Sequence, residues 1–177
     1  MTATQRHSNP LSNRAGFSLV ELMVTLAVLA IMTGIAIPSV LAWMPDIYLK
    51  DQAAEVKSAM MKARSLAING GTEYRVVFNL DTGAFQIDQG DLMVGSTNWT
   101  TKFGPFETTG GVGFSDASAQ METAGLNKPF LRFGTNGAVV TNEDTLTLKM
   151  TNSKTHVLAL NATRRTGHVE IVKEYMP

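Results

Sequence analysis

A single carboxylate, Glu21, stands near the start of an apolar run that extends from Phe17 to Met44. An isolated charge in a hydrocarbon environment is costly, by about 2.5–3.5 kcal/mol or more at the centre of a bilayer. A carboxylate kept at such a depth therefore indicates a function. Because a buried charge needs a partner, we expect Glu21 either to pair with a positive charge or to stay protonated until it meets one.

The apolar run that holds this carboxylate is long enough to cross a membrane, since a spanning helix needs about 20 apolar residues. An ordinary secretory signal has a shorter apolar region of about 7–15 residues, with its cleavage site after that region. The preceding segment contains Arg6, His7 and Arg14 and no acidic residue. Basic residues favour the cytoplasmic side, so the C-terminal bulk is expected outside the cytoplasm. A plain single-pass anchor is the alternative, although it gives no reason for Glu21.

The N-terminus resembles that of type IV pilins and type II secretion pseudopilins. The residues that carry the resemblance are Gly16, Phe17, Ser18, Leu19, Glu21, Leu22 and Pro38. The resemblance implies that residues 1–16 form a leader, that prepilin peptidase cuts between Gly16 and Phe17, and that Phe17 becomes N-methylated. The lack of a side chain at Gly16 suits a close approach by a protease. The resemblance also implies that Glu21 pairs with the terminal amine of a neighbouring subunit in a filament.

The overall charge is balanced, with 15 basic and 15 acidic residues. Removal of the leader takes away Arg6 and Arg14, which leaves 15 − 2 = 13 basic residues against 15 acidic ones. This balance argues against bulk electrostatic binding of nucleic acid. The chain has no cysteine, whereas many pilins carry a disulfide. The exported part is therefore expected to depend on its apolar core.

The helical part is expected in two sections, a membrane or filament-core helix over residues 17–45 and an amphipathic continuation over 46–70. Pro38 and Pro45 are expected to interrupt or kink it, because each proline removes a backbone hydrogen bond. Beyond Asp46, apolar residues recur at steps of three and four, which predicts one buried face. These residues are Leu49, Ala53, Val56, Met60, Ala63 and Ala67. The run Asn69-Gly70-Gly71 is expected to end the helix.

Residues 71–177 are expected to form a β-rich head, because the apolar period changes to that of strands. A hairpin is predicted at the Asp81-Thr82-Gly83 turn, and residues 90–128 are expected to be mostly irregular loops. Strands are predicted at 73–80, 84–88, 99–103, 111–114, 129–134, 138–141, 145–150, 155–160 and 167–173. The short polar turns between the later strands indicate an antiparallel meander. The expected fold class is α+β, a pilin fold with a long N-terminal helix packed on an antiparallel sheet.

The C-terminal half resembles the minor pilin and pseudopilin group called GspH/FimT. The group shows an F-x-x-x-G hairpin, which Phe133 and Gly137 fit, followed by two strands joined by a turn with Gly and Arg. Some members bind DNA through a G-R-x-R motif in this turn. The aligned residues here, Gly167-His168-Val169-Glu170, lack both arginines. Arg164 and Arg165, with His168, are therefore candidates for weak DNA contact only.

The sequence contains no motif of an enzyme, and neither a cofactor nor a metal site is expected. The leading interpretation is a minor pilin of a type IV pilus that takes part in assembly or priming near the tip. The alternatives are an H-type minor pseudopilin of a type II secretion system and a DNA-binding pilin for natural transformation. The implied partners are other pilin subunits and minor pilins, prepilin peptidase, the inner-membrane assembly platform and membrane lipid. The implied location is the inner membrane, with the head in the periplasm, and then the filament.

Overall fold

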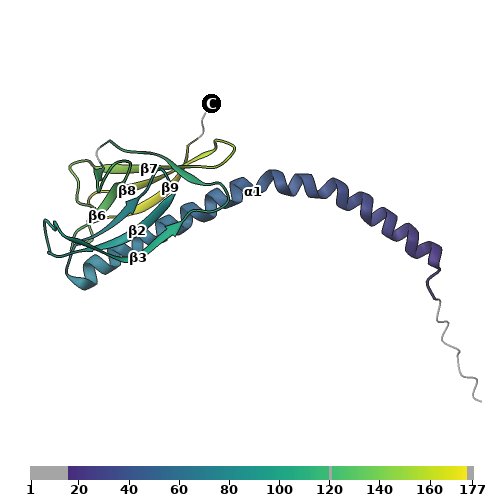
Figure 1. Ribbon diagram of the computed structural model, residues 1–177, viewed down its shortest axis with the longest axis horizontal. Coiled ribbons are helices and arrows are strands. Elements are labelled where there is room, and N and C mark those ends of the chain that lie inside the picture. The colour runs from purple at the N-terminus through teal and green to yellow at the C-terminus, as the bar shows by residue number, and fades with distance from the viewer. Residues whose placement is uncertain (1–15, 120, 175–177) are drawn as a thin grey trace, which may run out of the picture. The chain divides into compact units, whose positions relative to one another are not determined.

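A long helix is followed by nine strands in the part of the chain that the computed structural model describes, residues 16–119 and 121–174. The helix, α1, spans Leu19–Gly70 (Figure 1). The chain divides into two compact units between Val40 and Leu41, within this helix. The second unit holds the remainder of α1 and all the strands, and we call it the head. Residues 1–15 of the expected leader lie outside the described residues.

The helix does not end at Pro38 or Pro45, because α1 continues through both residues. The expected kink at each of these prolines stays a prediction. Each proline removes one amide donor, but the hydrogen bonds of the neighbouring residues can keep the turn helical.

The predicted end of the helix is confirmed. Gly71 adopts a φ of 62° and donates its N–H to the Ala67 carbonyl at 3.2 Å. This left-handed residue is the usual glycine termination of an α-helix.

The strands form two antiparallel sheets. Their bounds are β1 Tyr74–Phe78, β2 Ala84–Gly90, β3 Trp99–Glu107, β4 Gly113–Ala117, β5 Glu122–Thr123, β6 Pro129–Phe133, β7 Thr145–Thr151, β8 Val157–Thr163 and β9 Val169–Glu174. The first sheet has the order β3-β2-β1-β6-β5, and the second has the order β4-β7-β8-β9. The β1–β2 hairpin forms at the predicted turn, and Phe78 pairs with Phe85 beside it.

The predicted antiparallel meander is confirmed for β7, β8 and β9, which pair in chain order. It is wrong for β6, which pairs with β1 in the other sheet, and β7 has β4 as its second neighbour. The strand predicted at 138–141 does not form, apart from one bridge between Phe133 and Val139. The backbone of this segment links the two sheets instead. Val139 N–H donates to the Arg164 carbonyl at 2.9 Å, and Val140 N–H donates to the Arg132 carbonyl at 2.8 Å.

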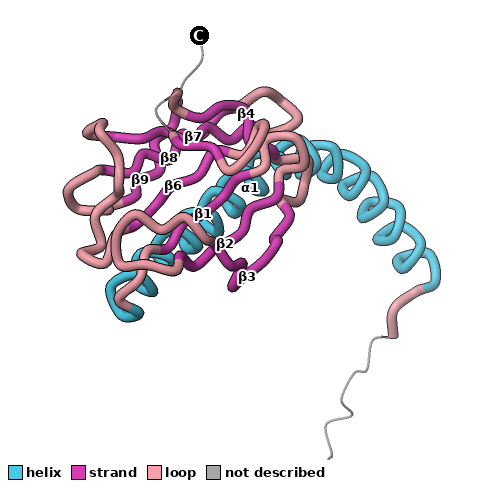
Figure 2. Tube along the Cα trace, turned by 60° about the vertical axis from the view of Figure 1, so that its left-hand side comes forward, coloured by secondary structure: helices cyan, strands magenta, loops and turns pink. Residues whose placement is uncertain are grey.

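The core of the head is formed by buried residues of α1 and of the two sheets. Figure 2 shows how these strands are arranged beside the helix. All six residues of the predicted apolar face are buried, from Leu49 to Ala67. The alanines on this face allow the helix to approach the strands closely, because they have no long side chain to accommodate. Phe78 and Phe114 join the two sheets through an edge-to-face contact with ring centres 5.4 Å apart. Such aromatic pairs add stability beyond the area that they bury.

Candidate functional site

The predicted cleavage site lies in a segment without regular secondary structure just before α1. Gly16 is exposed, and a Cβ placed there would have no heavy atom within 4 Å. Phe17 is 81% exposed. Ser18 caps the helix that follows, since its Oγ accepts a hydrogen bond from the Val20 N–H at 3.3 Å. Sequence reasoning used Ser18 only as part of the resemblance, although serine three residues before Glu21 is a capping pattern.

Glu21 lies in the first turn of α1 and is exposed. The free N–H groups at the start of a helix favour a negative charge there. Among the described residues, no basic side chain forms an ion pair with Glu21. Its carboxylate is therefore available to a cation from outside this chain.

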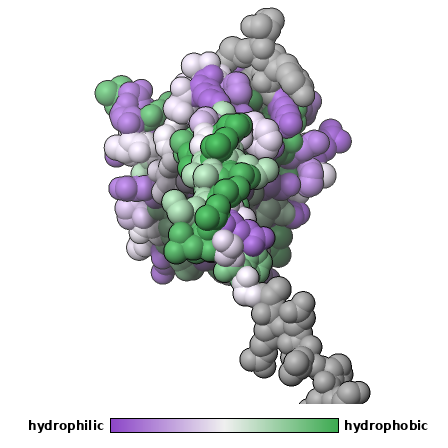
Figure 3. All heavy atoms as spheres, turned by 90° about the vertical axis from the view of Figure 1, so that its right-hand side faces the viewer, coloured by the Kyte–Doolittle hydropathy of each residue, from purple (hydrophilic) through white to green (hydrophobic). Residues whose placement is uncertain are grey.

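The helix around Glu21 presents apolar side chains to its surroundings on all faces. Exposed fractions range from 73% at Leu19 to 49% at Val28 and 74% at Ile35. Figure 3 shows these apolar side chains gathered over the segment. By length and composition, α1 is the one described helix that could cross a membrane. Exposed apolar surface of this extent indicates contact with lipid or with other protein chains.

At the other end of the chain, two glycines of the C-terminal motifs lie against α1, Gly137 in the loop after β6 and Gly167 in the β8–β9 turn. Gly137 has a φ of 75° and Gly167 a φ of 60°. The Gly137 carbonyl accepts a hydrogen bond from Arg64 Nε at 2.9 Å. A Cβ on Gly167 would collide with that same carbonyl and would lie 2.8 Å from Arg64 Nε. Only glycine permits this approach without displacement of the backbone. Arg64 of α1 takes part in the same contact, and it was not predicted from the sequence.

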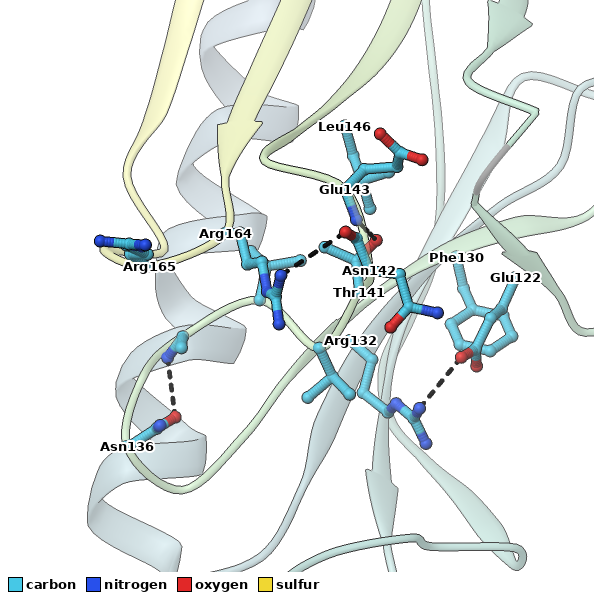
Figure 4. A pocket seen from close by; sticks show the side chains of 13 residues that line it. Glu122, Phe130, Arg132, Asn136, Thr141, Asn142, Glu143, Leu146, Arg164 and Arg165 are labelled. Carbon is cyan, nitrogen blue, oxygen red and sulfur yellow. Dashed lines mark hydrogen bonds and ion pairs between the residues drawn. The ribbon is translucent and has the colours of Figure 1, made fainter.

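The two candidate DNA-contact arginines lie at the rim of a groove of about 880 Å³ (Figure 4). Arg164 is fixed by its backbone, whose N–H donates to the Asp144 carbonyl at 2.9 Å, and its guanidinium reaches the Asn142 carbonyl at 3.5 Å. Arg165 points away from the other labelled side chains in Figure 4. Farther along the groove, Arg132 pairs with Glu122 at 3.0 Å. Arg164 and Arg165 are thus neighbours in the same turn, but their side chains point in different directions.

The motif positions that follow the turn alternate between surface and core. His168 and Glu170 are exposed, and Val169 between them is fully buried at the start of β9. The two arginine positions of the DNA-binding motif are therefore surface positions, and one of them carries an acid. The side chains that DNA phosphates would meet at this turn are Arg164, Arg165 and His168, opposed by Glu170.

The other histidine of the described residues, His156, lies elsewhere. The register of β8 and β9 pairs Val157 with Glu174 and Ala162 with Val169, so His156 and His168 lie at opposite ends of the strand pair. His156 Nδ1 lies 2.6 Å from Asp46 Oδ1 on α1. The described residues include no group of three possible metal ligands.

Comparison with known proteins agrees with this geometry. The model of the prokaryotic N-terminal methylation motif matches residues 11–37. Two structures of the minor pseudopilin EpsH from the type 2 secretion system of Vibrio cholerae are similar to this chain. They share 17% and 16% identity with it, each at a TM-score of 0.51. The alignments cover 71% and 73% of this chain and 96% of each EpsH chain. No curated protein matches.

Two conclusions follow from these comparisons. The N-terminus carries the methylation motif that the resemblance identified, and the matched residues include Gly16, Phe17 and Glu21. The head has the fold of a minor pseudopilin, with one long helix packed on antiparallel sheets. The predicted fold class and the resemblance to pilins and pseudopilins are confirmed.

Proposed function

Because the chain is a pilin-like protein with a prepilin methylation motif, we propose that it is a minor subunit of a type IV pilus. In this proposal, prepilin peptidase removes residues 1–16 and methylates Phe17. The subunit waits in the inner membrane with its head in the periplasm, and it then enters the filament near the tip, where it takes part in priming. Its partners are other pilin subunits, the assembly platform and, before assembly, membrane lipid.

The observation that carries this proposal is the placement of Glu21 on α1. It lies four residues after Phe17, which is about one helical turn, in a helix whose other side chains nearby are apolar and exposed. A neighbouring subunit that packs against this helix brings its own terminal amine into the same apolar layer. Water and salt screen a charge pair in such a layer only weakly. The pair therefore favours one register of the two helices along each other.

The experiment is to follow incorporation of Glu21 variants into sheared filaments. Glu21→Ala and Glu21→Gln should insert into the membrane as well as wild type does, because both remove a costly charge. Both should be depleted from filaments, because the partner amine then lacks a counter-charge. Thr25→Ala is the matched control, since Thr25 is the next polar residue along α1 and its hydroxyl bonds only to the Leu22 carbonyl among the described residues. Equal incorporation of all three variants would show that Glu21 has no role in assembly.

A second candidate function is that of an H-type minor pseudopilin in a type II secretion system. The fold similarity to EpsH favours it. The two candidates predict different losses when the gene is deleted. Loss of surface pili with normal secretion supports the pilus, whereas accumulation of exoproteins in the periplasm supports the pseudopilus. Neighbouring genes provide the quickest first indication.

A third candidate, uptake of DNA through Arg164, Arg165 and His168, has weaker support. The three side chains are exposed at one turn, but Glu170 follows them on the same strand end. Affinity for DNA grows with the number of phosphates contacted, and so few cations contribute little.

A further inference from the structure

The loop between β2 and β3 exposes three large apolar residues in succession. Leu92, Met93 and Val94 are 48%, 63% and 78% exposed, and we call them the apolar tip. Single exposed apolar side chains are common on protein surfaces, but an unbroken run of them indicates a contact. The apolar tip belongs to the head, so the membrane-spanning length of α1 does not explain its exposure.

The loop that carries the apolar tip is held at its base by a buried carboxylate. Glu73 is 1% exposed, and its Oε2 accepts the Ser96 N–H at 2.8 Å. The Ser96 hydroxyl closes the loop, because its Oγ accepts the Leu92 N–H at 3.1 Å and donates to the Leu92 carbonyl at 3.0 Å. A loop that is fixed in this way loses little conformational freedom when it binds a partner.

The loop carries a single charge beside the apolar tip, and this charge is negative. Asp91 is the only charged residue between residues 91 and 98. A hydrogen bond from the Asn98 side chain at 2.9 Å lowers the pKa of Asp91, so its carboxylate is ionised at neutral pH. An apolar surface with an acidic flank is unsuited to anionic lipid or to DNA. It suits an apolar cavity whose rim is basic.

The groove beside Arg164 and Arg165 is such a cavity. Its volume of about 880 Å³ is that of a pocket for a ligand or a few side chains. Its wall includes the buried apolar side chains of Phe130, Val139 and Leu146. Its lining contains three arginines and two glutamates, so its formal charge is 3 − 2 = +1. The groove therefore complements the apolar tip in polarity and Asp91 in charge.

The apolar tip and the groove are separate surfaces of one head. Residues 91–98 are not among the described residues that line the groove of the same chain. A contact between the two surfaces therefore joins two copies, and it repeats from copy to copy instead of closing a symmetric dimer. Three side chains bury much less than the roughly 800 Å² per partner of a stable interface. The contact thus acts between copies that are already held side by side, at a high effective concentration.

We propose that the apolar tip of one copy inserts into the groove of a second copy, with Asp91 facing the arginines at the rim. The contact sets how neighbouring heads are oriented. It makes no use of Glu21, so it stands or falls independently of the proposed role of that residue in assembly.

Disulfide trapping between two copies of the full chain tests the contact. The chain has no cysteine, so each introduced thiol is unique. One copy carries Val94→Cys and the other, with a different affinity tag, carries Asn142→Cys in the lining of the groove. Both are reconstituted in vesicles of neutral phospholipid and oxidised. The control partner is Ser115→Cys, an exposed position on β4 outside the groove. The Val94–Asn142 disulfide should exceed the Val94–Ser115 disulfide several-fold, and equal yields would overturn the proposal.

A polar substitution in the apolar tip tests its apolar character. Met93→Gln in the copy with Val94→Cys should lower the yield of the Val94–Asn142 disulfide several-fold. Leu126→Gln is the matched control, because Leu126 is also a large exposed apolar residue on a loop of the head, and it should leave the yield unchanged. A loss of equal size for the Val94–Ser115 pair would indicate that the apolar tip contacts lipid, and it would refute the proposal.

A double-mutant cycle tests the charge pair at the rim. Asp91→Asn removes the charge of the tip copy, and Arg164→Ala with Arg165→Ala removes the rim charges of the groove copy. Each change alone should lower the yield of the Val94–Asn142 disulfide, and the two together should lower it no further than either alone. Lys102→Ala, at an exposed position on β3, is the control for loss of a positive charge. Additive losses, or none, would contradict the pairing of Asp91 with the rim.

Discussion

Substitution of Gly167 tests whether the C-terminal motif is a packing device between the β8–β9 turn and α1. Gly167→Ala introduces two separate costs. The first is the left-handed backbone at a φ of 60°, which costs an L-residue about 1–2 kcal/mol. The second is the collision of the new methyl group with the Gly137 carbonyl and the Arg64 side chain, a form of overpacking that costs about 1–3 kcal/mol. Together they should lower the free energy of unfolding by about 2–5 kcal/mol.

Gly71→Ala separates the two costs. Gly71 has nearly the same φ, 62°, but a Cβ there would have no heavy atom within 4 Å. This variant should therefore lose only about 1–2 kcal/mol of unfolding free energy. Urea titration of a fragment that begins at Leu41 gives both values from the shift in midpoint at constant m. If Gly167→Ala costs no more than Gly71→Ala, the close approach to α1 contributes nothing and the packing account of the motif is wrong.

Three further predictions concern the head. Met60→Asp should unfold it, as seen by loss of the circular dichroism signal, because Met60 is 1% exposed and the new charge has no partner. Asp46 has a lowered pKa, chiefly because His156 hydrogen-bonds to its carboxylate. The stability that the Asp46 carboxylate contributes is therefore fully present above its ordinary pKa of 3.8 and is lost as the pH falls through the lower pKa of the folded state. Wild type and Asp46→Asn should accordingly differ in their urea midpoints at neutral pH and converge in acid. Any retention of DNA in a gel shift should weaken steeply with salt and disappear in Arg164→Ala, Arg165→Ala; retention that survives both changes would place the DNA site elsewhere.

The parts of the structure that sequence reasoning predicted depend on local patterns. The apolar spacing from Leu49 to Ala67 predicted the buried face of α1, and the glycines at its end predicted where it stops. The turn at Asp81-Thr82-Gly83 predicted the first hairpin. In each case, neighbouring residues determine the conformation, so their order along the chain carries the information.

The parts that sequence reasoning missed depend on contacts between distant segments. Arg64 and Gly137 are 73 residues apart in the chain, and Asp46 and His156 are 110 apart. Nothing near Asp46 in the sequence indicates its partner. The alternation of apolar and polar residues predicts that a segment is a strand, but it does not indicate which other strand that segment pairs with.

The central claim is that the protein is processed as a prepilin and enters filaments through its new N-terminus. Intact-mass and N-terminal analysis of the protein purified from membranes tests it most directly. We expect a chain that begins at Phe17 with one methyl group on its amine. A chain that retains the leader, or one that is cut after the apolar segment, would contradict it.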